Sequence, residues 1–231
     1  MILTHTLFLT FILAVGGCLS SSTIEDFPDS PKSYEPQSVT SIPKVPEPFF
    51  LEGGTFSITE DETIYFVDLH DKSIVRKAKL VDPTKVTTFI NLNEWLKVEN
   101  SKTFQIDDIY SDYLGRLIVA ESTTGKILRI SKDARKLENL ADSYDGYRFS
   151  KIKGLAGNEK DQIFIGTPNA ATIYEFNPRV GKLNILNDEL VRPNDFTMNR
   201  KGDRLLVAES APNRIVVFEL DQGSLWMQVG I

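Results

Sequence analysis

The stretch RPNDFTMNRKGDRLLVAESAPNRIVVFEL, residues 192–220, contains two apolar runs, LLVAES and RIVVFEL, each bounded by turn-forming residues. A Pro-Asn turn and a short apolar run precede them, and a Lys-Gly-Asp turn follows that short run. Short runs of β-branched, aliphatic and aromatic residues between Gly, Asn, Asp and Pro are typical of strands rather than helices. The stretch therefore predicts a meander of antiparallel strands.

The same unit occurs four times along the chain. Its second strand reads IYFVD, LIVAE, IFIGT and LLVAE in successive copies, which start at Ile64, Leu117, Ile163 and Leu205. A repeat of roughly 40 to 50 residues is typical of propeller blades. We expect an all-β fold, a β-propeller of four-stranded antiparallel blades, with an irregular β-sandwich as the alternative. The expected blades cover about residues 49–92, 103–142, 149–188 and 190–231, and a short helix is expected within residues 91–102.

The first 48 residues differ from the repeats in composition. The apolar run LFLTFILAVGG, residues 7–17, is shorter than the roughly 20 residues of a membrane-spanning helix but fits a secretory signal. VGGC, which ends at Cys18, resembles the lipobox of bacterial lipoproteins, although no Lys or Arg precedes the apolar run. We expect a signal peptide (1–17), a lipidated Cys18, a Ser/Pro-rich tether (18–48) and a propeller domain (49–231). The protein is then exported and anchored to a membrane, in the periplasm or at the cell surface; an uncleaved anchor, ordinary secretion and a chance apolar start are the alternatives.

Composition excludes several classes of function. The formal net charge of -6, the pI near 5.1 and the scattered Lys and Arg residues argue against a nucleic-acid partner. One cysteine allows no intramolecular disulfide. Because His70 is the only histidine after the apolar leader, a zinc site and a Ser-His-Asp triad are both disfavoured.

One position of the repeat is a candidate site. When the copies are aligned on their second strands, Glu52, Asp107, Lys153 and Asn194 stand where the chain enters the innermost strand, beside the expected central channel. Three of these residues offer oxygen atoms, which suit a hard cation such as Ca²⁺ with its roughly six to eight oxygen ligands. The alternative for each residue is a turn former that hydrogen-bonds its own backbone.

These motifs carry a resemblance to a known family. LVRPNDFTMNRKGDRLLVAESAPNRIVVFELDQG and LEGGTFSITEDETIYFVDL resemble the gluconolactonase, senescence-marker-protein and strictosidine-synthase-like superfamily over roughly residues 50–220. The resemblance implies a six-bladed propeller with Ca²⁺ or another divalent cation, for which Glu52 and Asn194 are the matching ligands. It further implies cation-assisted hydrolysis of a small-molecule lactone or ester, with a nearby carboxylate as base. Asp107 and Asp195 are the candidates for that catalytic carboxylate.

The chain departs from the family pattern in three places. Pro-Asn-Gly has become Pro-Asn-Asp at Asp195, and Lys153 stands where relatives commonly carry an aspartate ligand. An ammonium group there would repel a cation. Only four copies of the repeat are visible, so we also expect a truncated propeller. Two functions stay open: the hydrolase, and a non-catalytic propeller that binds a ligand or a protein, in which Lys153 replaces the metal and pairs with Glu52 or Asp107.

Overall fold

The computed structural model describes residues 55–97, 103–220 and 228–230, with the side chains of the last three left out. The chain divides into two units, residues 1–43 and 44–231, and all described residues belong to the second. The expected leader, Cys18, the tether and Glu52 lie outside the described residues. Within the described part, no helix is long and apolar enough to cross a membrane.

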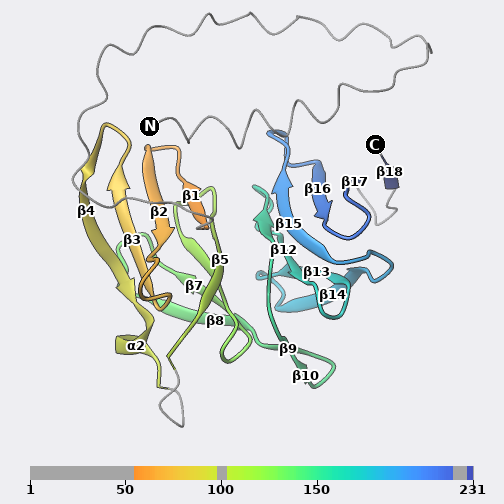
Figure 1. Ribbon diagram of the computed structural model, residues 1–231, viewed down its shortest axis with the longest axis horizontal. Helices are drawn as coiled ribbons and strands as arrows, with labels where there is room; N and C mark the ends of the chain where they lie inside the picture. Colours follow the sequence, from red (N-terminus) through yellow and green to blue (C-terminus); the bar gives the residue numbers. More distant parts are fainter. Residues whose placement is uncertain (1–54, 98–102, 221–227, 231) are drawn as a thin grey trace, which may run out of the picture. The chain divides into compact units, whose positions relative to one another are not determined.

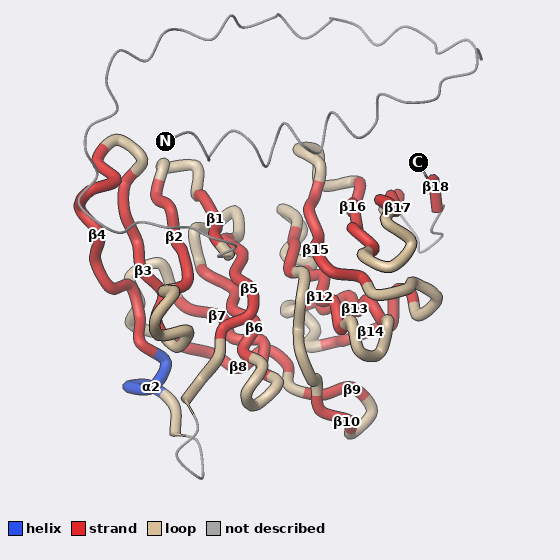
Figure 2. The backbone as a smooth tube through the Cα atoms, in the orientation of Figure 1, coloured by secondary structure: helices blue, strands red, loops and turns tan. Residues whose placement is uncertain are grey.

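Four antiparallel sheets of four strands follow one another along the chain, each a meander in sequence order (Figures 1 and 2). We number these sheets as blades 1 to 4. The strands of blades 1 and 2 are β1 (Phe56–Ile58), β2 (Thr63–Val67), β3 (Ile74–Lys79), β4 (Asp82–Asn91), β5 (Ile106–Ser111), β6 (Leu117–Glu121), β7 (Lys126–Ile130) and β8 (Leu137–Ala141). Those of blades 3 and 4 are β11 (Leu155–Gly157), β12 (Ile163–Thr167), β13 (Thr172–Asn177), β14 (Lys182–Asn187), β15 (Pro193–Met198), β16 (Arg204–Glu209), β17 (Arg214–Glu219) and β18 (Gln228–Gly230).

Two short elements connect blades. Helix α2 (Leu92–Trp95) follows blade 1, within the range in which a short helix was expected, and Asn91 caps it by accepting a hydrogen bond from the Asn93 N–H. A small hairpin, β9 (Ser143–Tyr144) and β10 (Tyr147–Arg148), joins blades 2 and 3. The predicted all-β fold of four-stranded antiparallel blades is therefore confirmed, and the fold is that of a β-propeller.

A polar residue directly follows the first strand of each blade and shapes the turn into the second. Asp112 accepts hydrogen bonds from the N–H groups of Leu114 and Arg116, both at 2.9 Å. Asn199 does the same in blade 4, and Asn158 and Thr59 hold the equivalent turns of blades 3 and 1. Such side chains imitate a backbone turn, so this part of each repeat is set locally by its sequence.

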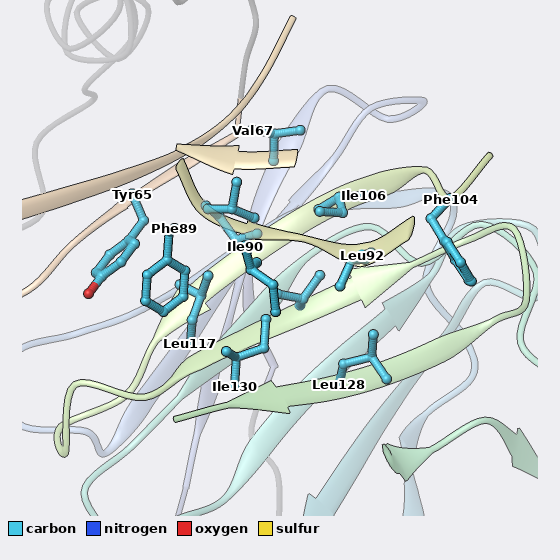
Figure 3. Packing of buried hydrophobic residues seen from close by; sticks show 13 residues of the cluster. Tyr65, Val67, Phe89, Ile90, Leu92, Phe104, Ile106, Leu117, Leu128 and Ile130 are labelled. Carbon is cyan, nitrogen blue, oxygen red and sulfur yellow. The ribbon is translucent and has the colours of Figure 1, made fainter. Parts of the chain in front are cut away.

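The hydrophobic core lies in three layers between successive blades, because alternate residues of a strand point to opposite faces of its sheet. The face of a blade that packs on the preceding blade is here called its first face, and the other its second face. In the layer between blades 1 and 2, the rings of Tyr65 and Phe89 meet edge to face with their centroids 4.7 Å apart, and Leu117 of blade 2 lies near them (Figure 3). Two further layers join blades 2 and 3 and blades 3 and 4. The first strands β1, β5, β11 and β15 also lie side by side in that order.

The Pro-Asn segment differs from the expectation of a turn. Pro193 and Asn194 begin strand β15, and Pro193 pairs with Glu209 of β16. A proline is tolerated as the first residue of a strand, where no ladder hydrogen bond from its nitrogen is needed. The strand therefore starts two residues earlier than the composition of the segment predicts.

Candidate functional site

Two bulges mark the same position in blades 2 and 4. In β5 the pairing moves from Ile106 opposite Glu121 to Asp108 opposite Ala120, which leaves Asp107 as the extra residue. In β15 the pairing moves in the same way from Pro193 to Asp195, which leaves Asn194 as the extra residue. Bulges redirect side chains and are common beside active sites. Asp107 and Asn194 thus occupy equivalent positions at the start of two first strands.

The register of β11 places Lys153 and Gly154 at these positions in blade 3. Leu155 pairs with Ile165 as Ile109 pairs with Val119, so Lys153 corresponds to Asp107 and Gly154 to Asp108. The Lys153 N–H donates to the Gly166 carbonyl at 2.8 Å, and the residue is exposed.

Gly154 has a structural reason for lacking a side chain. Its φ of +84° is one that residues with a Cβ rarely adopt. A Cβ there would lie 2.8 Å from the Phe196 ring of blade 4. The third blade therefore has no room for a carboxylate at this position.

Asp108 is a carboxyl group with a strongly raised pKa, and the sequence did not single it out. Its Oδ1 accepts a hydrogen bond from the Ile109 N–H at 2.8 Å, and its Oδ2 accepts one from the Leu155 N–H of blade 3 at 2.7 Å. Burial raises the pKa of Asp108 to about 7; the charge of Asp195 adds to the rise, and the backbone N–H groups of Leu155, Ile109 and Gly154 oppose it. Asp108 thus links two blades. One sequence feature could have pointed to Asp108: the pair Asp107-Asp108 aligns with Asn194-Asp195 of the Pro-Asn-Asp segment.

Asp195 lies at the position in blade 4 that Asp108 occupies in blade 2. Its Oδ1 accepts a hydrogen bond from the Phe196 N–H at 2.8 Å. Solvent reaches the residue, yet surrounding protein desolvates the carboxyl group and raises its pKa, while the charge of Lys153 lowers it. Asp195 also raises the pKa of Asp108. Lys153, Asp195 and Asp108, from three neighbouring blades, therefore form one electrostatically connected group.

The remaining predicted residues lie around this group. Asp107 is half-buried; its Oδ1 accepts a hydrogen bond from Gln105 Nε2 at 3.0 Å, and its carbonyl accepts one from the Thr55 hydroxyl at 3.1 Å. Asn194 is exposed at its bulge. Glu52 and Cys18 lie outside the described residues. Of the predicted residues, Lys153 and Asp195 are therefore the two that the structure brings close enough to interact electrostatically.

The described residues alone do not fit a Ca²⁺ ion. In residues 55–97 and 103–220, no group of three or more His, Cys, Asp or Glu side chains is arranged to hold a metal. Asn194 and Asp195 offer oxygen atoms, but Ca²⁺ takes about six to eight oxygen ligands. The ammonium group of Lys153, which acts electrostatically on Asp195, would repel a cation placed there.

The group nevertheless has a definite chemical capacity. An ammonium group can bind a carbonyl oxygen and stabilise the negative charge that develops on it during attack by water. A carboxyl group with a raised pKa can accept a proton and return it near neutral pH. Lys153 supplies the ammonium group, and Asp195 supplies the carboxyl group with a raised pKa.

Comparison with solved structures shows the fold. A chain of the nidogen/laminin complex has a TM-score of 0.60 and 17% identity, over 76% of this chain and 63% of that one. Streptogramin B lyase has a TM-score of 0.58 and 13% identity, over 77% of this chain and 54% of that one. A gluconolactonase-type protein has a TM-score of 0.58 and 14% identity, over 74% of this chain and 60% of that one. The chain thus spans less than two thirds of the length of these structures.

The sequence comparisons show the family. No curated protein matches the chain. Residues 51–228 match the family described as "SMP-30/Gluconolactonase/LRE-like region", and this range contains all four blades except the last two residues of β18. The chain therefore belongs to the SMP-30/gluconolactonase/LRE-like family.

Proposed function

We propose that the protein hydrolyses a lactone or an ester at the site formed by Lys153 and Asp195. The observation that carries the proposal is electrostatic. The exposed ammonium group of Lys153 lies close enough to the partly desolvated carboxyl group of Asp195 to oppose the rise in its pKa. The two groups lie at the entry to neighbouring first strands, where a bulge occurs in blades 2 and 4. Family membership and the gluconolactonase-type structure support this class of reaction.

Asp195 is the proposed base. Its carboxylate takes a proton from a water molecule, whose oxygen attacks the carbonyl carbon of the substrate. Lys153 donates a hydrogen bond to the carbonyl oxygen as negative charge develops on it. The bond from the carbonyl carbon to the ring or ester oxygen then breaks, and Asp195 returns the proton to the departing oxygen. The products are a hydroxyl group and a carboxylic acid, so one water molecule is consumed and the enzyme is regenerated.

The surroundings of Asp195 suit it to the role of a base. A base works best when its pKa lies near the working pH, and desolvation moves the pKa of Asp195 in that direction. The Phe196 N–H holds one carboxylate oxygen in place. Asp107, the other predicted catalytic carboxylate, is bonded to Gln105 and is the second candidate for the base.

The test is a kinetic comparison of variants with simple lactones and aryl esters. We expect Asp195→Asn to lower kcat/KM by about 100- to 10,000-fold, because it keeps the hydrogen bond to Phe196 and loses the base. Lys153→Met is expected to lower it by about 100-fold, chiefly through kcat. Lys160→Met, which changes an exposed lysine beyond β11, is the matched control and should leave the rate unchanged. Equal rates in all variants would contradict the assignment of the site.

Binding without catalysis is the second candidate. The observation that favours it is the opposite charge of Lys153 and Asp195, which can hold a polar ligand without any reaction. It predicts no turnover of any lactone or ester, together with ligand binding that Lys153→Met weakens.

A divalent cation such as Ca²⁺, with Glu52 and Asn194 as ligands, stays a proposal. Calorimetric titration of the purified protein with Ca²⁺ tests it directly. Binding that Asn194→Ala weakens supports the cation, whereas no heat of binding at millimolar Ca²⁺ rejects it. Lys153→Met is expected to strengthen any such binding, because it removes a like charge.

Export and anchoring through a lipidated Cys18 are also proposed, from the apolar run that precedes VGGC. Mass spectrometry of the protein purified from membranes should find diacylglyceryl-modified Cys18 at the N-terminus. Cys18→Ser should release the protein from the membrane fraction. An unmodified, unprocessed N-terminus would contradict the proposal.

A further inference from the structure

The turns that follow the first strands of the four blades line a pocket of about 180 Å³. It lies at the ends of β1, β5, β11 and β15, whereas Lys153 and Asp195 lie where β11 and β15 begin. Along β5, Asp107 and Ser111 are four residues apart, which is about 13 Å at roughly 3.3 Å per residue. The pocket is therefore a separate site from the one proposed for hydrolysis.

Tyr110 and Gly157 form one wall of this pocket. A Cβ on Gly157 of blade 3 would lie 2.7 Å from the Tyr110 ring of blade 2, so the missing side chain gives the ring its place. The Tyr110 hydroxyl has no hydrogen-bond partner among the described residues and is available to a ligand. Ile58 of β1, which is 48% exposed, adds apolar surface to the pocket. This side of the pocket suits the apolar part of a ligand.

The charges around Tyr110 favour a cation in the pocket. Burial, and after it the negative charges of Asp112 and Asp161, raise the pKa of Tyr110 to about 12. Arg116 forms ion pairs with both carboxylates, at 2.6 Å with Asp112 and 2.7 Å with Asp161. Its single positive charge offsets only one of their two negative charges. A positively charged group on a ligand is therefore attracted to this wall.

Each blade contributes one more side chain to the pocket from the same position of the repeat. That position directly follows the polar residue of the turn between the first and second strands. The residues that hold it in blades 1 to 4 are Glu60, Tyr113, Glu159 and Arg200. All four are exposed, and within the described part of the chain none of their side chains has a hydrogen-bond or ion-pair partner. Their polar groups are therefore available to a ligand.

The order of these four side chains determines which ligand fits. Because the first strands lie side by side in blade order, the glutamates of blades 1 and 3 flank Tyr113 of blade 2. An ammonium group suits this place, since both carboxylates and the face of an aromatic ring attract it. Arg200 of blade 4 follows Glu159, and its guanidinium group is suited to bind a carboxylate. The pocket thus offers partners for both charges of a zwitterion.

We propose that this pocket binds a free amino acid with an apolar side chain. The ammonium group lies at Tyr113 between the two glutamates, the carboxylate at Arg200, and the side chain against Tyr110. A cavity of about 150 Å³ holds benzene, so a pocket of about 180 Å³ suits a molecule slightly larger than benzene, such as leucine.

The experiment is calorimetric titration of the purified full-length chain with three molecules that share one carbon skeleton. They are leucine, isoamylamine, which lacks the carboxylate of leucine, and isocaproate, which lacks its ammonium group. Leucine is expected to bind at millimolar concentration. Isoamylamine should bind about tenfold more weakly, because it loses a hydrogen bond to the charged Arg200. Isocaproate should not bind, because it brings no cation to the two glutamates.

Variants assign each charge of the ligand to its partner. Arg200→Met should raise the Kd of leucine about tenfold and leave that of isoamylamine unchanged. Lys201→Met is the matched control, since Lys201 is exposed and does not line the pocket. Glu159→Gln should raise the Kd of both ligands about tenfold. Lys153→Met, at the other end of the first strands, should bind leucine as the wild type does.

The substituted side chains are exposed, and circular dichroism checks that every variant is folded. Three results would overturn the proposal: no binding of leucine to the wild-type chain, isocaproate that binds as tightly as leucine, or equal losses in Arg200→Met and Lys201→Met. Leucine binding that Lys153→Met abolishes would also overturn it, because the amino acid would then lie at the site proposed for hydrolysis.

Discussion

Asp108 and Asp195 hold the same position in blades 2 and 4, and each accepts a hydrogen bond from the next residue's N–H at 2.8 Å. Their surroundings differ. Asp108 also accepts a hydrogen bond from the Leu155 N–H of blade 3, and its carboxyl group is largely buried. Asp195 is exposed, and the charge of Lys153 acts on its pKa. The repeat therefore fixes what the carboxylate does for its own backbone. The neighbouring blade decides whether it becomes a structural link or a reactive group.

The largest effect is expected at Gly154, which stands between the two aspartates in the repeat. Gly154→Ala should lower the free energy of unfolding by about 2 to 4 kcal/mol, because it adds backbone strain to a clash with the Phe196 ring 2.8 Å away. Gly146→Ala is the matched control, since Gly146 has a similar φ of +80° and nothing within 4 Å of an added Cβ. It should cost about 1 kcal/mol. Equal losses in urea unfolding would show that strain alone explains Gly154.

The repeat and the blade order could be predicted from the sequence because each strand and turn is determined locally. The residues of LLVAE and its relatives alternate between the two faces of their sheet, and Asn199 or Asp112 shapes its own turn. The role of Asp108 could not be predicted in this way. It depends on a bulge, which inserts one residue without a sequence signal, and on the N–H of Leu155, which is 47 residues away. The alignment of the copies singled out Asp107, which shares its position with Asn194, and not the neighbouring Asp108, which shares its position with Asp195.

The same long-range dependence affects the site. Lys153 was identified from the register of the copies, but its electrostatic effect on Asp195 arises only when β11 and β15 lie side by side. The predictions for Glu52 and Cys18 concern residues outside the described part of the chain and stay predictions. Local patterns thus predict the blades, and contacts between blades determine the chemistry.

The second prediction separates the two aspartates by their hydrogen bonds. Asp108→Ala should lower the free energy of unfolding by about 1 to 3 kcal/mol, since two N–H groups lose their acceptor and removal of a buried charge offsets only part of this loss. Asp195→Ala removes one acceptor at an exposed site and should cost less than about 1 kcal/mol. Asp108→Asn, which keeps one acceptor, should fall between them. Urea unfolding at pH 7 measures all three, and similar losses for the two alanine variants would break the comparison.

The smallest effect is the share of the pH dependence of stability that comes from repulsion between the carboxylates of Asp108 and Asp195. The pKa of Asp108 is about 7 in the folded protein and near its ordinary value in the unfolded chain, so the folded state keeps a proton that the unfolded state loses. This contribution to stability is fully present below about pH 4 and is lost as the pH rises through 7. Asp195→Asn removes one source of the raised pKa and keeps the bond to Phe196, so the loss of stability between pH 5 and pH 8 should shrink by about 1 kcal/mol. Urea unfolding at both values measures the change, with the exposed Glu189→Gln as the control that should behave as wild type. An unchanged loss in Asp195→Asn would mean that burial alone raises the pKa of Asp108, and that Asp195 is electrostatically independent of the blade junction.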